Sequence, residues 1–244
     1  MKYLMIIATD GIPTPEKSRA MLEGELDRWD EEMSERGVKL LGRPLHPREE
    51  AVTVRVRDGE TLVSDGPYVE AKEWVAGFDL IDCADLDEAI EVAAKIPVSW
   101  FHQIEIRPFR DDVELSDAAR AYARGEPAEG PVYAMLFFLD GVPEAPAVEE
   151  AIVRDALAWG EDLEHEGKRI LGFPLAHKDA ATTVRVRDGQ TLITDGPFIE
   201  TREFIGGMGV VRCADREEAI RLAAAHPLAR FHAVEVREIW EEEQ

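Results

Sequence analysis

Cysteine is scarce in this chain: 244 residues contain two, Cys83 and Cys213, which stand 130 positions apart. Neither has a second cysteine nearby, which argues against a metal site, a redox pair or a disulfide framework and favours a reducing, cytoplasmic environment. Long apolar runs are also missing. The first one ends at Asp10 and is too short for a signal peptide or a membrane span, so it predicts a first strand.

Positive charge is the second shortage. The chain has 28 basic and 51 acidic residues, and its formal net charge is -23. The excess is spread evenly, with 26 acidic and 14 basic residues up to position 114 and 25 and 14 after it. Such a surface repels phosphate backbones and anionic lipids, so we expect neither a nucleic-acid nor a membrane partner. It is typical of a soluble protein.

Recognisable cofactor motifs are the third shortage. The sequence shows no zinc-ligand spacing, no glycine-rich phosphate loop, no serine or cysteine nucleophile motif and no run of metal-binding carboxylates. We therefore expect no metal and no cofactor.

The sequence does contain a gapless tandem repeat. A shift of 130 positions aligns residues 1–114 with 131–244 and gives 41 identities. The shared segments are TVRVRDG (53–59 and 183–189), DGP (65–67 and 195–197), CAD (83–85 and 213–215) and FH (101–102 and 231–232). The repeat predicts two like domains, 1–110 and 131–240, joined by a linker over 111–130 with room for a short helix.

Each repeat is predicted to fold in the order strand, helix, strand, hairpin, strand, helix, strand. The TVRVRDG segment alternates around an Asp-Gly turn and predicts the hairpin. Without that hairpin the order is βαββαβ, a ferredoxin-like α/β plait with helices on one sheet face. The fold class is therefore α+β, of the dimeric α+β barrel type. We expect the two repeats to pack sheet to sheet as an intramolecular pseudo-dimer.

The hairpin and the following DGP(Y/F)-x-E-x-(K/R)-E segment, in this order of elements, resemble the YCII-related family and its DGPF-motif branch. The resemblance implies a dimeric α/β plait, formed in relatives by two separate chains and here by two fused copies. It also implies either lyase, isomerase or dehalogenase chemistry with an Asp–His pair, or a link to transcription. Asp65 and Asp195 match the motif aspartate. The histidine expected on the first helix has no match in LDRWDEE (26–32) or LAWGEDL (157–163).

The DGP residues have a structural and a functional interpretation. Glycine adopts positive φ, proline fixes φ, and aspartate accepts backbone N–H groups, so a tight turn explains all three residue types. The alternative is a carboxylate held at the mouth of a pocket. The residues concerned are Asp65, Gly66 and Pro67 in the first repeat and Asp195, Gly196 and Pro197 in the second.

Charged residues near the motif offer a second set of candidates. The acidic members are Glu70, Glu73, Glu200 and Glu203, which either form ion pairs that pin the loop or contact a ligand. The basic members are Arg55, Arg57, Arg185 and Arg187, on the hairpin face opposite the valines. They either pair with the motif carboxylates or bind an anionic small molecule, because guanidinium groups grip carboxylates with two hydrogen bonds.

His102 and His232 open the last strand of each repeat, on the face of its apolar residues. Each is either a hydrogen-bonded core residue or the acid–base partner of an aspartate. Three functions stay open. The first is binding of a small molecule near the DGP loops, with an anionic ligand as one option. The second is a cofactor-independent lyase or isomerase that uses Asp65, His102, Asp195 and His232. The third is a protein-interaction module linked to transcription regulation, and further homo-association is also open.

Overall fold

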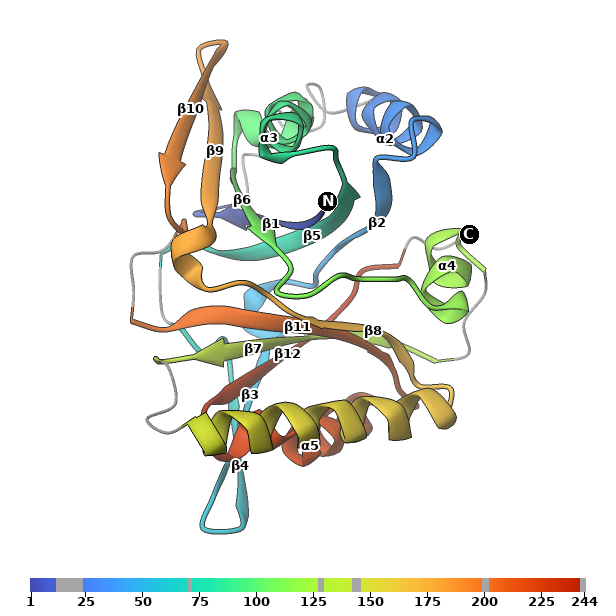
Figure 1. The fold of residues 1–244 in the computed structure, drawn as a ribbon, viewed down its shortest axis with the longest axis vertical. Coiled ribbons are helices and arrows are strands. Elements are labelled where there is room, and N and C mark those ends of the chain that lie inside the picture. Colours follow the sequence, from blue (N-terminus) through green and yellow to red (C-terminus); the bar gives the residue numbers. More distant parts are fainter. Residues whose placement is uncertain (12–23, 70–71, 127–129, 142–145, 199–201, 242–244) are drawn as a thin grey trace. The chain divides into compact units, whose positions relative to one another are not determined.

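The structure is a computed structural model that describes residues 1–11, 24–69, 72–126, 130–141, 146–198 and 202–241. It divides into two compact units (Figure 1). Unit 1 comprises Met1–Pro44, Ala71–Asp112 and Ala176–Glu200. Unit 2 comprises Leu45–Glu70, Val113–Leu175 and Thr201–Gln244. Each unit therefore contains most of one repeat and one segment of the other.

Unit 1 is a six-stranded antiparallel sheet with the strand order β10-β9-β6-β1-β5-β2. Its strands are β1 (Lys2–Thr9), β2 (Lys39–Pro44), β5 (Trp74–Asp82), β6 (Gln103–Pro108), β9 (Thr182–Arg187) and β10 (Gln190–Asp195). Its helices are α2 (Glu25–Glu35) and α3 (Leu86–Lys95), with short 3-10 turns η2 (Pro97–Trp100) and η3 (Lys178–Ala180). The four strands of the first repeat follow the order of a ferredoxin-like plait, as predicted.

Unit 2 repeats this arrangement with the order β4-β3-β12-β7-β11-β8. Its strands are β3 (Val52–Arg57), β4 (Glu60–Asp65), β7 (Val132–Leu139), β8 (Arg169–Pro174), β11 (Phe204–Arg212) and β12 (Ala233–Glu238). Its helices are α4 (Asp117–Ala123), α5 (Pro146–His165) and α6 (Arg216–Ala225), with 3-10 turns η1 (Arg48–Glu50) and η4 (Pro227–Arg230). Helix α4 lies in the segment that the sequence assigned to the linker.

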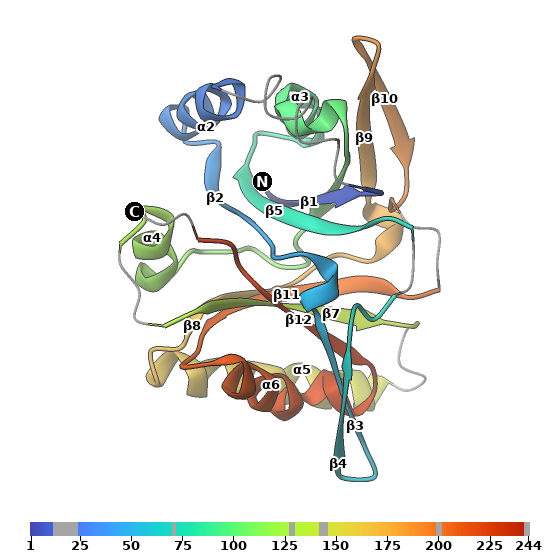
Figure 2. The ribbon, with the colours of Figure 1, turned by 180° about the vertical axis from the view of Figure 1, so that it is seen from behind.

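The hairpin of each repeat completes the sheet of the other. In unit 1, β9 pairs with β6 so that Val184 lies opposite Ile104. In unit 2, β3 pairs with β12 so that Val54 lies opposite Val234, which is the same register. The exchange is visible in the colours. In Figure 1, orange β9 and β10 join a blue and green sheet, and in Figure 2, cyan β3 and β4 join a sheet whose strands run from yellow-green to red.

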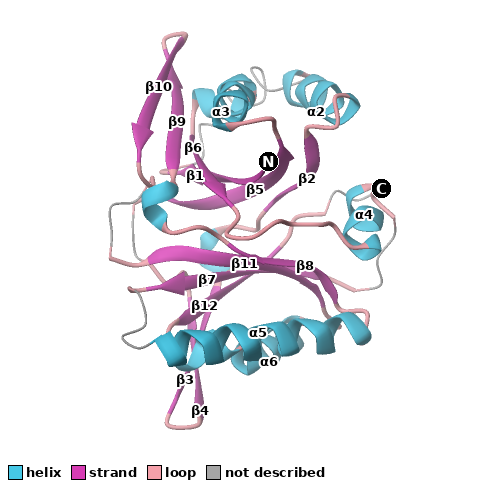
Figure 3. Cartoon of the chain, viewed as in Figure 1, coloured by secondary structure: helices cyan, strands magenta, loops and turns pink. Residues whose placement is uncertain are grey.

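The core of each unit lies between its sheet and its helices. In unit 1, Trp29 and Met33 of α2 pack with Ile104 and Ile106 of β6. The exchanged Val184 belongs to the same cluster. In unit 2, helices α5 and α6 cover one face of the sheet (Figure 3), and the buried cluster beneath them includes the exchanged strand β3. Since the hairpin valines are buried in these cores, apolar burial stabilises the exchange.

The predicted fold class is confirmed for both repeats, each of which forms an antiparallel plait. The sequence did not specify which sheet each hairpin would join. The sheet-to-sheet packing of the two repeats stays a prediction. No helix in the described ranges combines the length and the apolar character that a membrane-spanning segment needs.

Candidate functional site

Both DGP segments form tight turns that require glycine. Gly66 has φ 94° and Gly196 has φ 109°, values that favour glycine. The Gly66 N–H donates to the Ala51 carbonyl at 2.8 Å, and the Thr53 hydroxyl donates to the Gly66 carbonyl at 3.0 Å. The corresponding bonds in unit 1 are 2.9 and 2.8 Å long. The backbone of each turn thus favours glycine, and Pro67 and Pro197 beside it are half-buried.

The residue after each DGP segment is anchored to a buried carboxylate in the last strand of the other repeat. The Tyr68 N–H donates to Glu235 at 2.9 Å, and Arg237 donates to the same carboxylate at 3.2 Å. Glu235 and Arg237 are 3% and 1% exposed. In unit 1, the Glu105 carboxylate accepts the Phe198 N–H at 3.1 Å. Each motif loop is therefore fixed by the sheet that its own hairpin joins.

The structure describes some of the charged residues that follow the DGP segment. Glu70 and Glu200 lie outside the described residues. Glu73 and Glu203 are half-buried. Lys72 forms an ion pair with Asp10 at 3.1 Å, and Arg202 donates to the Asp140 backbone carbonyl at 2.9 Å. The basic residue of the motif thus reaches the end of the first strand in each repeat.

The hairpin arginines differ in their surroundings. Arg57 donates to the backbone carbonyls of residues 229–232 at distances between 2.9 and 3.4 Å. The Arg55 guanidinium lies 4.6 Å from the centre of the Tyr68 ring, a cation–π contact. The Arg185 Nε is buried without a hydrogen-bond partner in the described structure, and Arg187 is exposed. The contacts of Arg55 and Arg57 hold the motif loop and the turn before β12.

Each histidine lies beside an aspartate at the end of a first strand. The His232 Nδ1 is 3.2 Å from the Asp140 Oδ1, although the geometry is not that of a hydrogen bond. Burial lowers the pKa of His232 below its ordinary 6.5, and Asp140 opposes this shift. Burial likewise lowers the pKa of His102, with Asp10 opposing. Both rings are therefore neutral at pH 7, and each can accept a proton.

The motif aspartate of unit 2 is not beside the histidine of that unit. Asp65 and Val236 both pair with Val52, on opposite sides of β3. His232 precedes Val236 by four residues, which is about 13 Å along a strand at roughly 3.3 Å per residue. The register in unit 1 is the same. The histidine's carboxylate neighbour is therefore the aspartate that ends the first strand.

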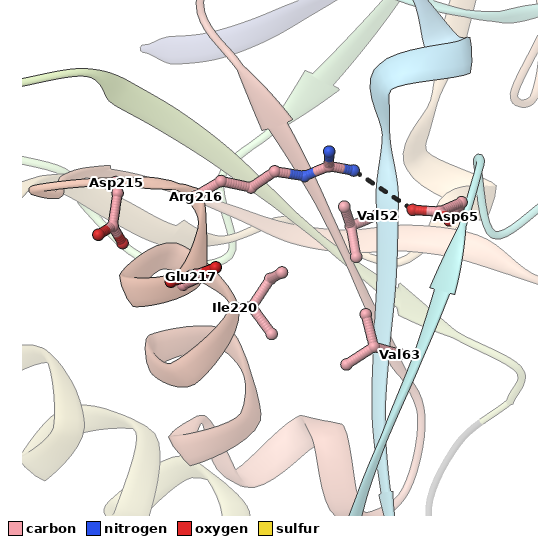
Figure 4. Close-up of a pocket in the computed structure, with 7 residues that line it drawn as sticks. All are labelled: Val52, Val63, Asp65, Asp215, Arg216, Glu217 and Ile220. Atoms are coloured by element: carbon pink, nitrogen blue, oxygen red, sulfur yellow. Dashed lines mark hydrogen bonds and ion pairs between the residues drawn. The ribbon is translucent and has the colours of Figure 1, made fainter.

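A pocket of about 420 Å³ lies in unit 2 between the exchanged hairpin and α6 (Figure 4). Asp65 and Arg216 form an ion pair there with 3.5 Å between Oδ1 and Nη2. The pocket is lined by Val52, Val63, Asp65, Asp215, Arg216, Glu217 and Ile220. The motif aspartate thus lines a pocket, and its side chain is 93% exposed.

Sequence reasoning missed three kinds of functional candidate. Asp10 was noted only as the end of the first strand and Asp140 was not noted, although both repeats carry the same Asp-Gly pair there. Glu235 was not a candidate, although its carboxylate anchors the motif loop. Nothing in the sequence singled out Arg216, because the two repeats carry different residues at that position. In the described part of the chain, no group of three or more His, Cys, Asp or Glu side chains is placed to hold a metal ion.

Comparison with known proteins gives a family and distant structural likenesses. The model of the YCII-related domain matches residues 1–110 and again 134–243. Uncharacterized protein R00369 of Rhizobium meliloti (strain 1021) is 55% identical over 49 residues, which are 20% of this chain and 40% of that protein. This chain therefore matches less than half the length of that relative.

Two solved structures cover 98% of the chain. A candidate chlorite dismutase, TA0507, is 9% identical with a TM-score of 0.44, and 95% of it is covered. A heme-binding protein from Thermus thermophilus is 11% identical with a TM-score of 0.41, and 91% of it is covered.

Proposed function

The chain belongs to the YCII-related domain family, and we propose that it binds a small molecule in the pocket beside Asp65. The observation that carries this proposal is the pocket itself. It lies between the DGP turn and the start of α6, and at about 420 Å³ it is within the range of small-molecule sites. The DGP turn of unit 2 would then have a role in binding as well as in closing a turn.

The lining of the pocket suits a ligand with an apolar body and a charged group. Val52, Val63 and Ile220 provide apolar surface, and Asp65 and Arg216 provide one charge of each sign (Figure 4). Burying the apolar part of a ligand supplies affinity, while the two charges orient it. This combination is typical of binding sites for small metabolites.

The walls of the pocket are fixed before any ligand arrives. On one side, the Gly66 turn is closed by the hydrogen bonds to Ala51 and Thr53. On the other, Asp215 caps α6 by accepting the Glu218 N–H at 2.7 Å. A preformed site avoids the loss of entropy that ordering a loop on binding would require.

The test is a metabolite screen by thermal shift with a blocked pocket. Val63 is 50% exposed at the pocket, so Val63→Trp should fill it while the hairpin stays folded. The matched control is Ile193→Trp, since Ile193 is the corresponding residue of β10 and is 53% exposed. A ligand at about 100 times its Kd should stabilise wild type and the control by about 2.7 kcal/mol but not Val63→Trp. A screen without hits, or hits that stabilise Val63→Trp equally, would refute the proposal.

A second candidate function is proton transfer by Asp140 and His232. The specific observation is the 3.2 Å separation of Asp140 Oδ1 and His232 Nδ1, together with a ring kept neutral by burial. A carboxylate near Nδ1 favours the tautomer that leaves Nε2 free to accept a proton. Such a pair would serve a cofactor-independent lyase or isomerase.

Hydrogen–deuterium exchange tests this second candidate. Ligands that still stabilise Val63→Trp in the screen, and so bind outside the Asp65 pocket, are incubated in D2O with wild type and His232→Gln, and NMR follows the loss of carbon-bound protons. We expect exchange by wild type and a loss of at least about 100-fold in the variant, the usual contribution of a general base. Equal rates for the two proteins, or no exchange above the buffer rate, would exclude proton transfer.

A further inference from the structure

The pocket in unit 2 holds two opposite charges side by side. Asp65 and Arg216 lie 3.5 Å apart, and their side chains are 93% and 49% exposed. Ion pairs this exposed contribute little to stability, because water screens them and two side chains must be held in place. A ligand can therefore separate the two groups and bind both without a large loss of stability.

We propose that the ligand is a small zwitterion with an aliphatic group, of the α-amino-acid class. This inference rests on the proposed function and names its ligand. The carboxylate of the ligand pairs with Arg216, whose guanidinium matches a carboxylate with two parallel hydrogen bonds. The ammonium group pairs with Asp65, and the aliphatic group lies on Val63 and Ile220.

The other acidic residues of the lining argue against a purely anionic ligand. The Asp215 carboxylate is occupied at the helix cap by the Glu218 N–H. Glu217 adds a further negative charge to the wall. Three carboxylates and one guanidinium would repel a phosphate or a dicarboxylate, whereas the ammonium group of a zwitterion offsets its carboxylate.

Unit 1 supplies a natural control because it lacks the arginine. The residues that correspond to the lining are Thr182, Ile193, Asp195, Asp85, Leu86, Asp87 and Ile90, so leucine stands in place of Arg216. Leu86 is the first residue of α3, as Arg216 is the first of α6. A carboxylate has no guanidinium to bind at that position. Arg216 therefore determines which unit binds the zwitterion, and the chain has one such site.

Isothermal titration of the full chain with three matched probes tests the inference. L-Leucine carries both charges, 4-methylpentanoate lacks the ammonium group, and 3-methylbutylamine lacks the carboxylate. We expect leucine to bind with a stoichiometry of one and at least tenfold more tightly than either analogue. Arg216→Leu should weaken leucine to the level of the amine, and Asp65→Asn should weaken it to the level of the acid. Leu86→Arg should raise the stoichiometry toward two.

Failure of the inference can be told apart from failure of the proposed function. The zwitterion is overturned if leucine binds no more tightly than both analogues, or if Arg216→Leu keeps the preference for leucine unchanged. The proposed function would still stand in that case if the screen finds ligands of the pocket. A screen in which Val63→Trp removes no ligand overturns both. Circular dichroism confirms that each variant folds, and Arg216→Lys, which keeps the charge, should retain part of the preference.

Discussion

The Glu235 carboxylate accepts a hydrogen bond from the Tyr68 N–H at 2.9 Å, although 167 positions separate the two residues. The contact exists because the β3–β4 hairpin joins the sheet of the other repeat. It carries the motif loop to β12, where Arg237 neutralises the carboxylate. The exchange of the hairpin thus also fixes the conformation of the DGP loop.

Replacing Glu235 should destabilise unit 2 by breaking a buried ion pair. Glutamine keeps an oxygen that can accept the Tyr68 N–H, but it removes the buried negative charge that pairs with Arg237. Removing one partner of a buried pair costs about 3–5 kcal/mol. We expect Glu235→Gln to lower the free energy of unfolding by about 3 kcal/mol, measured by urea denaturation.

The control for this variant is Glu91→Gln. Glu91 is 72% exposed and lies 3.8 Å from Lys95, so its loss should change stability by less than about 0.5 kcal/mol. A Glu235→Gln protein as stable as this control would show that the Glu235–Arg237 pair does not hold the loop in solution.

Gly66→Ala should be destabilising through backbone strain alone. A methyl group at Gly66 would meet no atom within 4 Å, but φ is 94°. The left-handed region costs a residue with a Cβ about 1–2 kcal/mol, so we expect a loss of that size in the free energy of unfolding. Gly11→Ala serves as control, because it also has open space and no strained φ. Equal effects of the two substitutions would contradict the strained turn.

The sequence predicted the local elements better than their partners. Asp58 and Gly59, with alternating residues on both sides, were sufficient to predict the hairpin, and their φ values of 52° and 81° confirm its turn. Pairing of β3 with β12 depends on contacts between distant residues that no local pattern encodes. The same limit applies to the site: Gly66 was predictable from its residue type, whereas the meeting of Asp65 with Arg216 depends on the exchanged hairpin.

His226 should make the protein less stable as the pH is lowered. Burial lowers its pKa from 6.5 to about 3, because the ring is 4% exposed and stacks on Phe137 at 4.1 Å. Its contribution to stability is fully present above pH 6.5 and is lost as pH falls from 6.5 to about 3, where only the unfolded chain binds the proton. The slope from this group approaches about 1.4 kcal/mol per pH unit.

The His226→Asn variant isolates that contribution. Asparagine does not titrate, and its oxygen can still accept the Leu228 N–H, which now bonds the His226 Nδ1 at 3.3 Å. Urea denaturation between pH 8 and pH 4 should give a shallower slope for the variant, by nearly one proton. The difference in stability between wild type and the variant at pH 8 measures the packing that the substitution removes. Parallel pH profiles would show that His226 is not buried as a neutral ring.

Gly42 and its counterpart Gly172 offer a matched pair for the last prediction. A Cβ at Gly42 would overlap the buried Asp79 carboxylate, which is paired with Lys39 at 3.3 Å. Gly172 has only ordinary contacts, because Gly209 occupies the position equivalent to Asp79. Gly42→Ala should therefore cost about 1–3 kcal/mol by overpacking, whereas Gly172→Ala should stay within about 1 kcal/mol.

The double variant Gly42→Ala/Asp79→Gly decides whether this overlap is the cause. Asp79→Gly alone leaves Lys39 without its buried partner and should be destabilising. It also removes the carboxylate that the added methyl group would strike, while the Lys39 Cε at 2.8 Å stays in place. The loss in the double variant should therefore be smaller than the sum of the two single losses by at least about 1 kcal/mol. Strictly additive losses in urea denaturation would mean that the Asp79 carboxylate is not what resists the added methyl group.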